Sequence, residues 1–216
     1  MKIAGRVVLV TDVHLGIGAA LVRGLLARGA AKVYAQTEAR GRVVPDGAAP
    51  ILLPITRRQQ FLALARRLAD VTFLVNNVAS SGRAAMADVH SDVRPSQSLR
   101  SRFDRAEQFI DAFVPVLAPP GGGAIATVLT QSTSYTPWQP EAISPALPTA
   151  DWPGHAALNV RLEAQGIESL FVHAALVDPG ADLPMSSREA LAYHMAQRVL
   201  DVLERGPRTR VASPLQ

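Results

Sequence analysis

Short apolar runs alternate with amphipathic segments along most of this chain, and this alternation limits the folds that it can adopt. The apolar runs lack the alternating polar residues of a half-exposed sheet, so we expect both faces of each strand to be covered. The predicted strands span residues 5–11, 32–35, 50–53, 71–75, 124–129, 169–173 and 210–212. The predicted helices span residues 16–29, 57–69, 99–117, 151–166 and 186–203. A doubly wound α/β fold with a central parallel sheet of six or seven strands follows.

Composition narrows the class of protein. A chain of 216 residues with 48% hydrophobic and 19% charged residues is typical of a globular protein, and we predict a single domain over residues 1–216. No apolar run reaches the roughly 18 to 20 residues of a membrane-spanning helix. The absence of cysteine excludes disulfides, thiolate nucleophiles and cysteine-ligated zinc, and the five histidines have no ligand-like spacing. We therefore expect a cytoplasmic protein with no membrane partner and no metal.

The charge distribution argues against nucleic acid as a partner. The chain carries 22 basic and 18 acidic residues, a formal net charge of +4, and nearly all of the basic residues are arginines. Arginines gather at residues 57–58, at 66–67 and between 94 and 105, but aromatic residues do not alternate with them as stacking platforms for bases would require. We expect these arginines on solvated helix faces.

A proline-rich stretch interrupts the second half of the chain. Between residues 131 and 153 lie Pro137, Pro140, Pro145, Pro148 and Pro153. Because proline lacks a backbone N–H and has a fixed φ, no regular helix is expected there. Trp138 and Trp152 lie near the first and the last of these prolines, where they either anchor an irregular loop or line a pocket.

A glycine-containing turn follows the first predicted strand and opens the first predicted helix. Residues 11–18 read TDVHLGIG, and a dinucleotide-binding turn belongs at this place because glycines let the backbone approach a pyrophosphate. Together with LVNNVA at residues 74–79 and GGGAI at residues 121–125, this turn resembles the short-chain dehydrogenase/reductase family, and the resemblance runs from residue 2 to about residue 212. It implies a Rossmann-type fold and NAD(P)-dependent oxidation or reduction. The residues that match the cofactor-binding pattern of the family are Gly16, Ile17, Gly18 and Asn76.

The chain departs from the cofactor-binding pattern of the family at two charged positions. Asp12 stands where the family has its first glycine, and its carboxylate would repel a diphosphate. Asp12 either caps the first helix in place of the diphosphate or weakens the diphosphate-binding site. Glu38, after the second strand, disfavours the 2′-phosphate of NADP. We therefore expect NAD(P) binding to be weakened or lost, and NADP to be disfavoured.

The catalytic set implied by the resemblance is replaced. Thr130 falls at the serine position, at the start of a hydroxyl-rich segment of residues 130–135 that we expect to form a loop. Ser144 falls at the tyrosine position and Pro148 at the lysine position, and no Tyr-x-x-x-Lys motif occurs in the chain. The nearest tyrosine is Tyr135. The candidate catalytic residues are therefore Thr130, Tyr135 and Ser144.

Two classes of function remain open. The first is a degenerate dehydrogenase relative that is non-catalytic, binds a small-molecule ligand, or acts as a subunit in a homo- or hetero-oligomer with an active relative. Family members usually dimerise through the two long helices of the second half, and here prolines replace the first turns of the second one. The alternative is an enzyme. It is either an NAD(P)-dependent oxidoreductase with an unusual proton donor such as Tyr135, or a cofactor-independent lyase, isomerase or cyclase. The second form would use the vacated pocket, the space that the cofactor occupies in the family.

Overall fold

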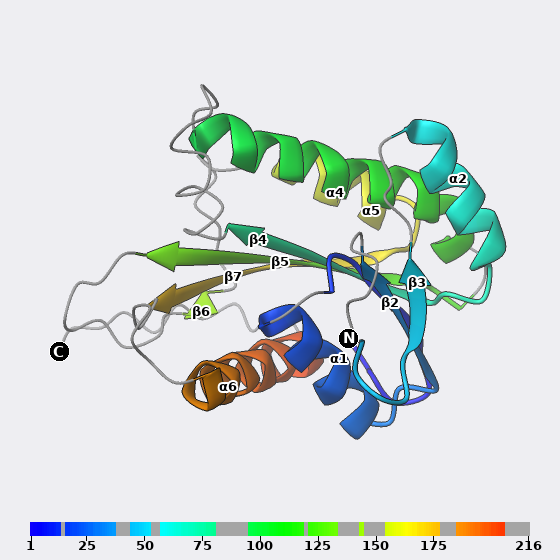
Figure 1. Cartoon of the computed structure of the whole chain (residues 1–216). Coiled ribbons are helices and arrows are strands. Elements are labelled where there is room, and N and C mark those ends of the chain that lie inside the picture. The colour runs from blue at the N-terminus through cyan, green and yellow to red at the C-terminus, as the bar shows by residue number, and fades with distance from the viewer. Residues whose placement is uncertain are drawn as a thin grey trace, which may run out of the picture.

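The computed structural model describes residues 1–13, 16–37, 44–52, 57–80, 95–118, 121–133, 143–144, 154–177 and 185–205. Within these ranges seven strands form one sheet in the order β3-β2-β1-β4-β5-β7-β6. Helices cover both faces of the sheet (Figure 1). The predicted doubly wound α/β fold is confirmed, and the strand predicted over residues 210–212 lies outside the described residues.

Six of the strands run parallel and one does not. The strands are β1 (Val7–Val10), β2 (Lys32–Thr37), β3 (Ala49–Leu52), β4 (Phe73–Ser80), β5 (Ala124–Thr133), β6 (Ile143–Ser144) and β7 (Glu168–Val177). All neighbouring pairs are parallel except β6 and β7, which are antiparallel. The sequence did not predict β6, because its two residues fall within the proline-rich stretch.

Helices α1 and α6 cover one face of the sheet, and α2, α4 and α5 cover the other (Figure 1). Their bounds are α1 (Ile17–Ala27), α2 (Arg58–Arg67), α4 (Pro95–Leu117), α5 (His155–Glu163) and α6 (Met185–Arg205). Helix α5 begins four residues after the predicted start at residue 151. The parallel strands share one polarity, so their carboxyl ends lie together at one edge of the sheet, the carboxyl edge, and their amino ends lie at the opposite edge, the amino edge.

The hydrophobic core consists of two clusters, one on each face of the sheet. In β1, Val8 and Val10 pack in the cluster with α1 and α6, whereas Leu9 packs in the cluster with α2, α4 and α5. Likewise Phe73 belongs to the first cluster and Leu74 to the second. Successive strand residues point to opposite faces, so covering both faces requires continuous apolar runs. This explains the pattern from which the fold was predicted.

Within the described ranges, none of the helices combines the length and the hydropathy of a membrane-spanning segment.

Candidate functional site

The turn after β1 lies between β2 and β4 at the carboxyl edge. The Thr11 N–H donates to the Val75 carbonyl at 3.0 Å, and the Val13 N–H donates to the Gln36 carbonyl at 2.7 Å. The turn is therefore fixed to both neighbouring strands. Ligands of open α/β sheets bind at this kind of position, outside the carboxyl ends of the strands.

Asp12 adopts a backbone conformation that favours glycine, with a φ of 53°. Its N–H donates to Oε1 of Gln36 at 2.9 Å, and its carbonyl accepts a hydrogen bond from Nδ2 of Asn77 at 3.2 Å. Aspartate tolerates the left-handed region better than most residues do. The turn thus keeps the left-handed conformation that a glycine would allow, although a carboxylate replaces the first glycine. The N-cap residue of α1 is Gly16, so Asp12 does not occupy the capping position.

Gly16 and Gly18 each have a specific reason to be glycine. Gly16 has a φ of 83° and open space where a Cβ would lie. A Cβ on Gly18 would lie 2.9 Å from Nδ2 of Asn77 and 3.1 Å from the Asp12 carbonyl oxygen, so Gly18 allows α1 to pack closely on the turn. The first turn of α1 has no acidic residue, and the side chain of Ile17 is buried in the core. The described residues of this turn therefore include the two glycines that a dinucleotide-binding turn needs, and among them the carboxylate of Asp12 does not suit a phosphate.

Three buried side-chain oxygens in β4 and β5 have no hydrogen-bond partner among the described residues. They are Oδ1 of Asn76, Oδ1 of Asn77 and Oγ1 of Thr130. The Asn76 amide nitrogen donates to the Ala106 carbonyl of α4 at 3.4 Å. An unpaired buried polar group costs about 1–3 kcal/mol, and in native proteins such groups usually meet water or a ligand.

Asn77 and Thr130 lie on the same face of the sheet. Asn77 is in register with Val128, and Val128 is two residues before Thr130 on β5. Val128 packs in the cluster with α1 and α6, so both unpaired oxygens belong to the face that α1 covers. Asn76 points to the opposite face, toward α4. The structure therefore places the Thr130 side chain on the face of the sheet that α1 covers, which is also the face of the glycine turn.

Thr130 lies within a strand, so the predicted loop over residues 130–135 is wrong for its first four residues. Strand β5 continues to Thr133, and Thr130 is in register with Ala79 of β4 and Ala174 of β7. Strand β4 extends beside β5 as far as Gln131, and β7 extends as far as Thr133, so both provide backbone partners that keep this segment extended.

Ser144, the residue at the tyrosine position, lies in β6 opposite His173 of β7. The family resemblance implies a helix at this position, whereas the chain has an edge strand. Because β7 separates β5 from β6, the backbones of Thr130 and Ser144 are about 10 Å apart, two strand spacings. Arg102 is half-buried on α4.

Several predicted residues lie outside the described ranges. These are Glu38, Tyr135, Trp138, Pro148 and Trp152. The preference against NADP and the role of Tyr135 therefore stay predictions.

Both lysines of the chain lie at the amino edge, far from this site. Lys32 is the first residue of β2, and its Nζ donates to Tyr34 Oη at 2.5 Å and contacts Asp70 at 3.3 Å. These hydrogen bonds to Tyr34 and Asp70 raise the pKa of Lys32 above 10.5. Lys2 follows Met1, whose ammonium lies 3.2 Å from Glu168 at the start of β7. The six residues of β2 place Lys32 about 17 Å from the other end of that strand.

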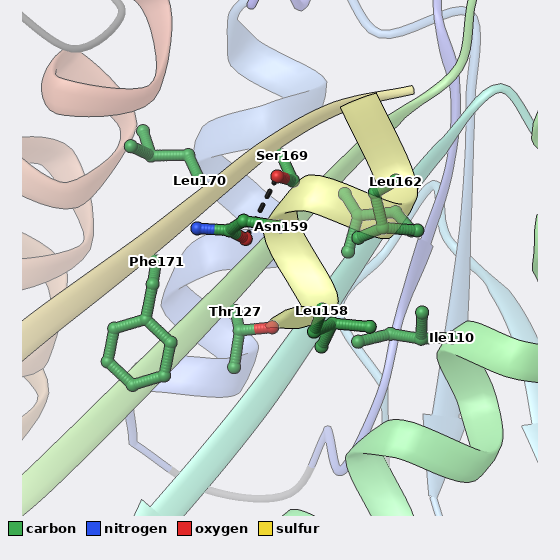
Figure 2. A pocket seen from close by; sticks show the side chains of 9 residues that line it. Ile110, Thr127, Leu158, Asn159, Leu162, Ser169, Leu170 and Phe171 are labelled. Atoms are coloured by element: carbon green, nitrogen blue, oxygen red, sulfur yellow. Dashed lines mark hydrogen bonds between the residues drawn. The ribbon is translucent and has the colours of Figure 1, made fainter. Parts of the chain in front are cut away.

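A small cavity lies between α4, α5, β5 and β7 (Figure 2). Its polar lining comes from Thr127, Asn159 and Ser169, and Ser169 Oγ donates to Asn159 Oδ1 at 3.0 Å. Its volume is about 10 Å³, enough for about one water molecule. Ser169 is the second residue of β7, near the amino edge. This cavity is therefore separate from the candidate site and too small for a nucleotide.

In the part of the chain that the structure describes, no group of three or more His, Cys, Asp or Glu residues could hold a metal ion.

Comparison with known proteins gives a match in structure alone. No protein-family model and no curated protein matches the sequence of this chain. Among solved structures, it is similar to a short-chain dehydrogenase from Burkholderia cenocepacia J2315 in complex with NADP, with 23% identity, a TM-score of 0.57 and coverage of 94% of both chains.

Two further solved structures are also similar to this chain. A metagenomic short-chain oxidoreductase in complex with NADP matches with 19% identity and a TM-score of 0.57, over 97% of this chain and 95% of the other. A C-terminal deletion mutant of Thermoplasma acidophilum aldohexose dehydrogenase matches with 16% identity and a TM-score of 0.58, over 94% and 90%. The chain therefore has the fold of the short-chain dehydrogenases, and the resemblance read from its sequence is confirmed at the level of the fold.

Proposed function

We propose that this chain is a ligand-binding relative of the short-chain dehydrogenases that does not carry out their hydride transfer. The observation that carries this proposal is the position of Lys2 and Lys32 at the amino edge of the sheet. Reduction of a carbonyl needs a proton donor at the developing alkoxide. In the family a tyrosine is this donor, because a nearby lysine lowers the pKa of the tyrosine hydroxyl. No lysine of this chain can do so at the carboxyl edge.

The ligand in this proposal is a nucleotide bound at the turn between β1 and α1. Gly16, Ile17 and Gly18 would hold a diphosphate through backbone N–H groups, and Asn76 would lie near the adenosine, as the family resemblance implies. NADP is bound in two of the similar structures. A bound NAD(P) would supply the hydride-accepting or hydride-donating ring. The unpaired Thr130 hydroxyl offers a hydrogen bond to the ligand on the same face, but no acid of suitable pKa.

The proposal includes a subunit role. Helix α5 has nine residues, and Arg161 of α5 pairs with Asp111 of α4 at 2.6 Å on the surface. Val160 of α5 is 68% exposed. The second of the two helices of the family dimer is thus shortened here, which favours a partner other than an identical copy bound in the family manner.

A titration and a turnover assay test the proposal together. Thermal unfolding is followed with NAD⁺, NADH, NADP⁺ and NADPH, and cofactor oxidation is followed with a panel of aldehydes and ketones. A ligand at 1,000 times its Kd stabilises the folded state by about 4 kcal/mol. We expect stabilisation by at least one nucleotide and no turnover. Turnover would overturn the non-catalytic assignment, and the absence of any stabilisation would overturn nucleotide binding.

A second candidate is an enzyme that uses the vacated pocket. The buried Thr130 hydroxyl without a partner among the described residues favours it, because such a group can contact a substrate. Two forms remain: an NAD(P)-dependent oxidoreductase with Tyr135 as proton donor, and a cofactor-independent lyase, isomerase or cyclase. A Tyr135→Phe variant separates them, since only the first form loses NAD(P)-dependent turnover in it.

A further inference from the structure

Helices α2 and α4 lie side by side on one face of the sheet and run in the same direction (Figure 1). Each starts after the carboxyl end of a strand and ends before the amino end of the next. The rings of Phe61 and Phe109 meet edge to face, with centroids 4.8 Å apart and an interplanar angle of 82°. This contact fixes the position of α2 along the axis of α4.

Four arginines gather beyond this contact, toward the carboxyl edge. Arg57 is four residues before Phe61, and Arg105 is four residues before Phe109, so each lies one helical turn from the aromatic pair. Arg58 is next to Arg57, and Arg102 is about one turn further along the α4 face that carries Arg105. We call Arg57, Arg58, Arg102 and Arg105 the arginine corner.

The arginine corner carries an excess of positive charge. Arg57 and Arg58 are exposed, while Arg102 and Arg105 are half-buried. No acidic residue occurs between residues 57 and 69, and no carboxylate of the described residues pairs with Arg57 or Arg58. The neighbouring stretch of α4 contains Asp104 and Glu107, and Arg102 and Arg105 already have interaction partners, so the positive charge that no carboxylate of the described residues pairs is that of Arg57 and Arg58.

The arginine corner borders the candidate site. The Asn76 side chain donates to the Ala106 carbonyl at 3.4 Å, so the residue after Arg105 lies at the level of Asn76 on β4. Asn76 is fully buried beneath α4, on the opposite face of the sheet from the glycine turn, so the arginine corner lies at the same carboxyl edge as the candidate site, on its α4 side.

We propose that the arginine corner binds a phosphate group, an inference that rests on the proposed function for the ligand at this edge. Guanidinium groups bind phosphate oxygens in pairs, with more geometric specificity than a lysine gives. The phosphate belongs either to the nucleotide, as the 2′-phosphate of NADP, or to a separate phosphorylated small molecule. The prediction from Glu38 opposes the first source, so the experiment must tell the two apart.

The two ends of α2 provide a matched pair of variants. The double variant Arg57→Gln/Arg58→Gln removes two charges at the carboxyl edge, and Arg66→Gln/Arg67→Gln removes two at the amino end of the same helix. All four side chains are exposed, and none pairs with a carboxylate of the described residues. Circular dichroism melting checks that both variants fold. Binding of NAD⁺, NADP⁺ and inorganic pyrophosphate is then measured by calorimetry at low and moderate salt.

We expect the first variant to weaken pyrophosphate binding about tenfold or more, and the second to leave it within about twofold of wild type. A loss confined to NADP⁺ and pyrophosphate, with NAD⁺ unchanged, identifies the nucleotide phosphate as the source. A loss for pyrophosphate alone identifies a separate phosphorylated molecule.

Other outcomes overturn one proposal without the other. Equal losses in both variants indicate general charge attraction and overturn the arginine corner. Nucleotide and pyrophosphate binding that is unchanged in the first variant also overturns it but leaves the proposed function standing. Pyrophosphate binding that depends on Arg57 and Arg58, in a protein that binds no nucleotide, supports the corner and overturns the proposed nucleotide function.

Discussion

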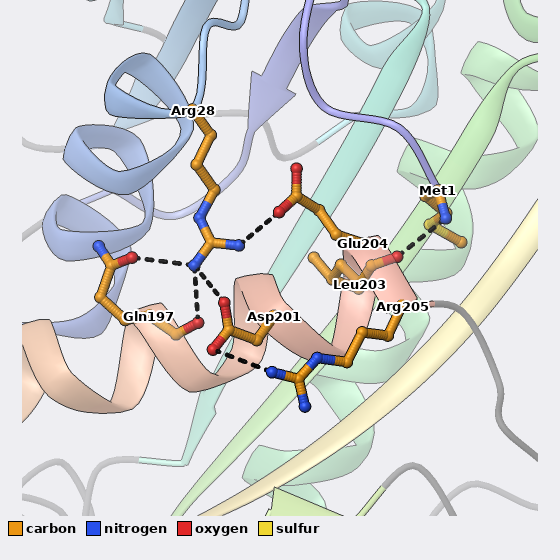
Figure 3. Close-up of polar contacts among 7 residues, drawn as sticks. All are labelled: Met1, Arg28, Gln197, Asp201, Leu203, Glu204 and Arg205. Atoms are coloured by element: carbon orange, nitrogen blue, oxygen red, sulfur yellow. Dashed lines mark hydrogen bonds and ion pairs between the residues drawn. The ribbon is translucent and has the colours of Figure 1, made fainter.

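Arg28, at the end of α1, donates to a carboxylate oxygen of Asp201 in α6 at 2.6 Å, across 173 residues of sequence (Figure 3). The other terminal guanidinium nitrogen lies 2.7 Å from Glu204, and the first also donates to the Gln197 carbonyl at 3.1 Å. The Met1 ammonium donates to the Leu203 carbonyl near the same end of α6. These contacts join the N-terminus and α1 to α6 on the face of the sheet that α1 shares with the glycine turn.

Replacing Arg28 by methionine should lower the free energy of unfolding by about 2 kcal/mol, because a largely buried guanidinium loses several charged hydrogen bonds. The Arg28 side chain is 17% exposed, whereas Arg161, paired with Asp111, is 50% exposed. The control Arg161→Met should therefore cost less than about 1 kcal/mol. Urea unfolding measures both variants, and equal losses would contradict this ranking.

Thr130→Val should raise the stability of the ligand-free protein by about 1 kcal/mol, because it removes a buried hydroxyl without a partner among the described residues. Thr11→Val is the matched control. Its Oγ1 accepts a hydrogen bond from the buried Asn77 N–H at 3.2 Å, so its loss should destabilise by about 1–2 kcal/mol. Thermal and urea unfolding should show changes in stability of opposite sign for the two variants. If Thr130 contacts the ligand, its valine variant also binds nucleotide more weakly despite being more stable.

Gly18→Ala should destabilise the protein by about 2 kcal/mol and weaken nucleotide binding, because its methyl group would meet the backbone of the turn. The nearest backbone atom is the Asp12 carbonyl oxygen at 3.1 Å. Gly24→Ala, in the same helix, provides the comparison. Its methyl group would meet Leu200 Cδ1 at 2.4 Å, away from the turn, so it should affect stability and leave affinity unchanged. Equal losses of affinity in the two variants would show that Gly18 has no special role.

The contacts of Lys32 predict a dependence of stability on pH. Because hydrogen bonds to Tyr34 and Asp70 raise its pKa in the folded state, the protonated form stabilises folding below pH 10.5. That contribution is lost as the pH rises through the raised pKa. Lys32→Met should therefore lower Tm at pH 8 and have a smaller effect above the raised pKa. NMR titration should also show a lower Lys32 pKa in Asp70→Asn than in wild type, and an unchanged pKa would contradict this account.

Much of the fold could be predicted because both faces of the sheet are buried. Strands such as β1 and β4 must be apolar at successive positions, and this requirement leaves a local pattern in the sequence. The glycine turn was largely local, since the φ of 83° at Gly16 belongs to the turn itself and a Cβ on Gly18 would meet the carbonyl oxygen of Asp12, although it would also meet the distant Asn77. The strand conformation at the end of β5 could not be predicted from nearby residues. Thr130 stays in a strand because β4 and β7, far away in the chain, extend beside it.

The amino-acid sequence by itself determined the α/β alternation, the remnant turn at residues 16–18 and the absence of a Tyr-x-x-x-Lys motif, because each of these is a matter of residue type and short spacing. Only the tertiary structure decided that Ser144 lies on an antiparallel edge strand, that both lysines lie at the amino edge, and that the contact of α2 with α4 sets Arg57 and Arg105 at one level. These relationships join residues that are distant in the chain. They are set by strand register and helix packing, which depend on the whole folded core and leave no short-range signal in the sequence.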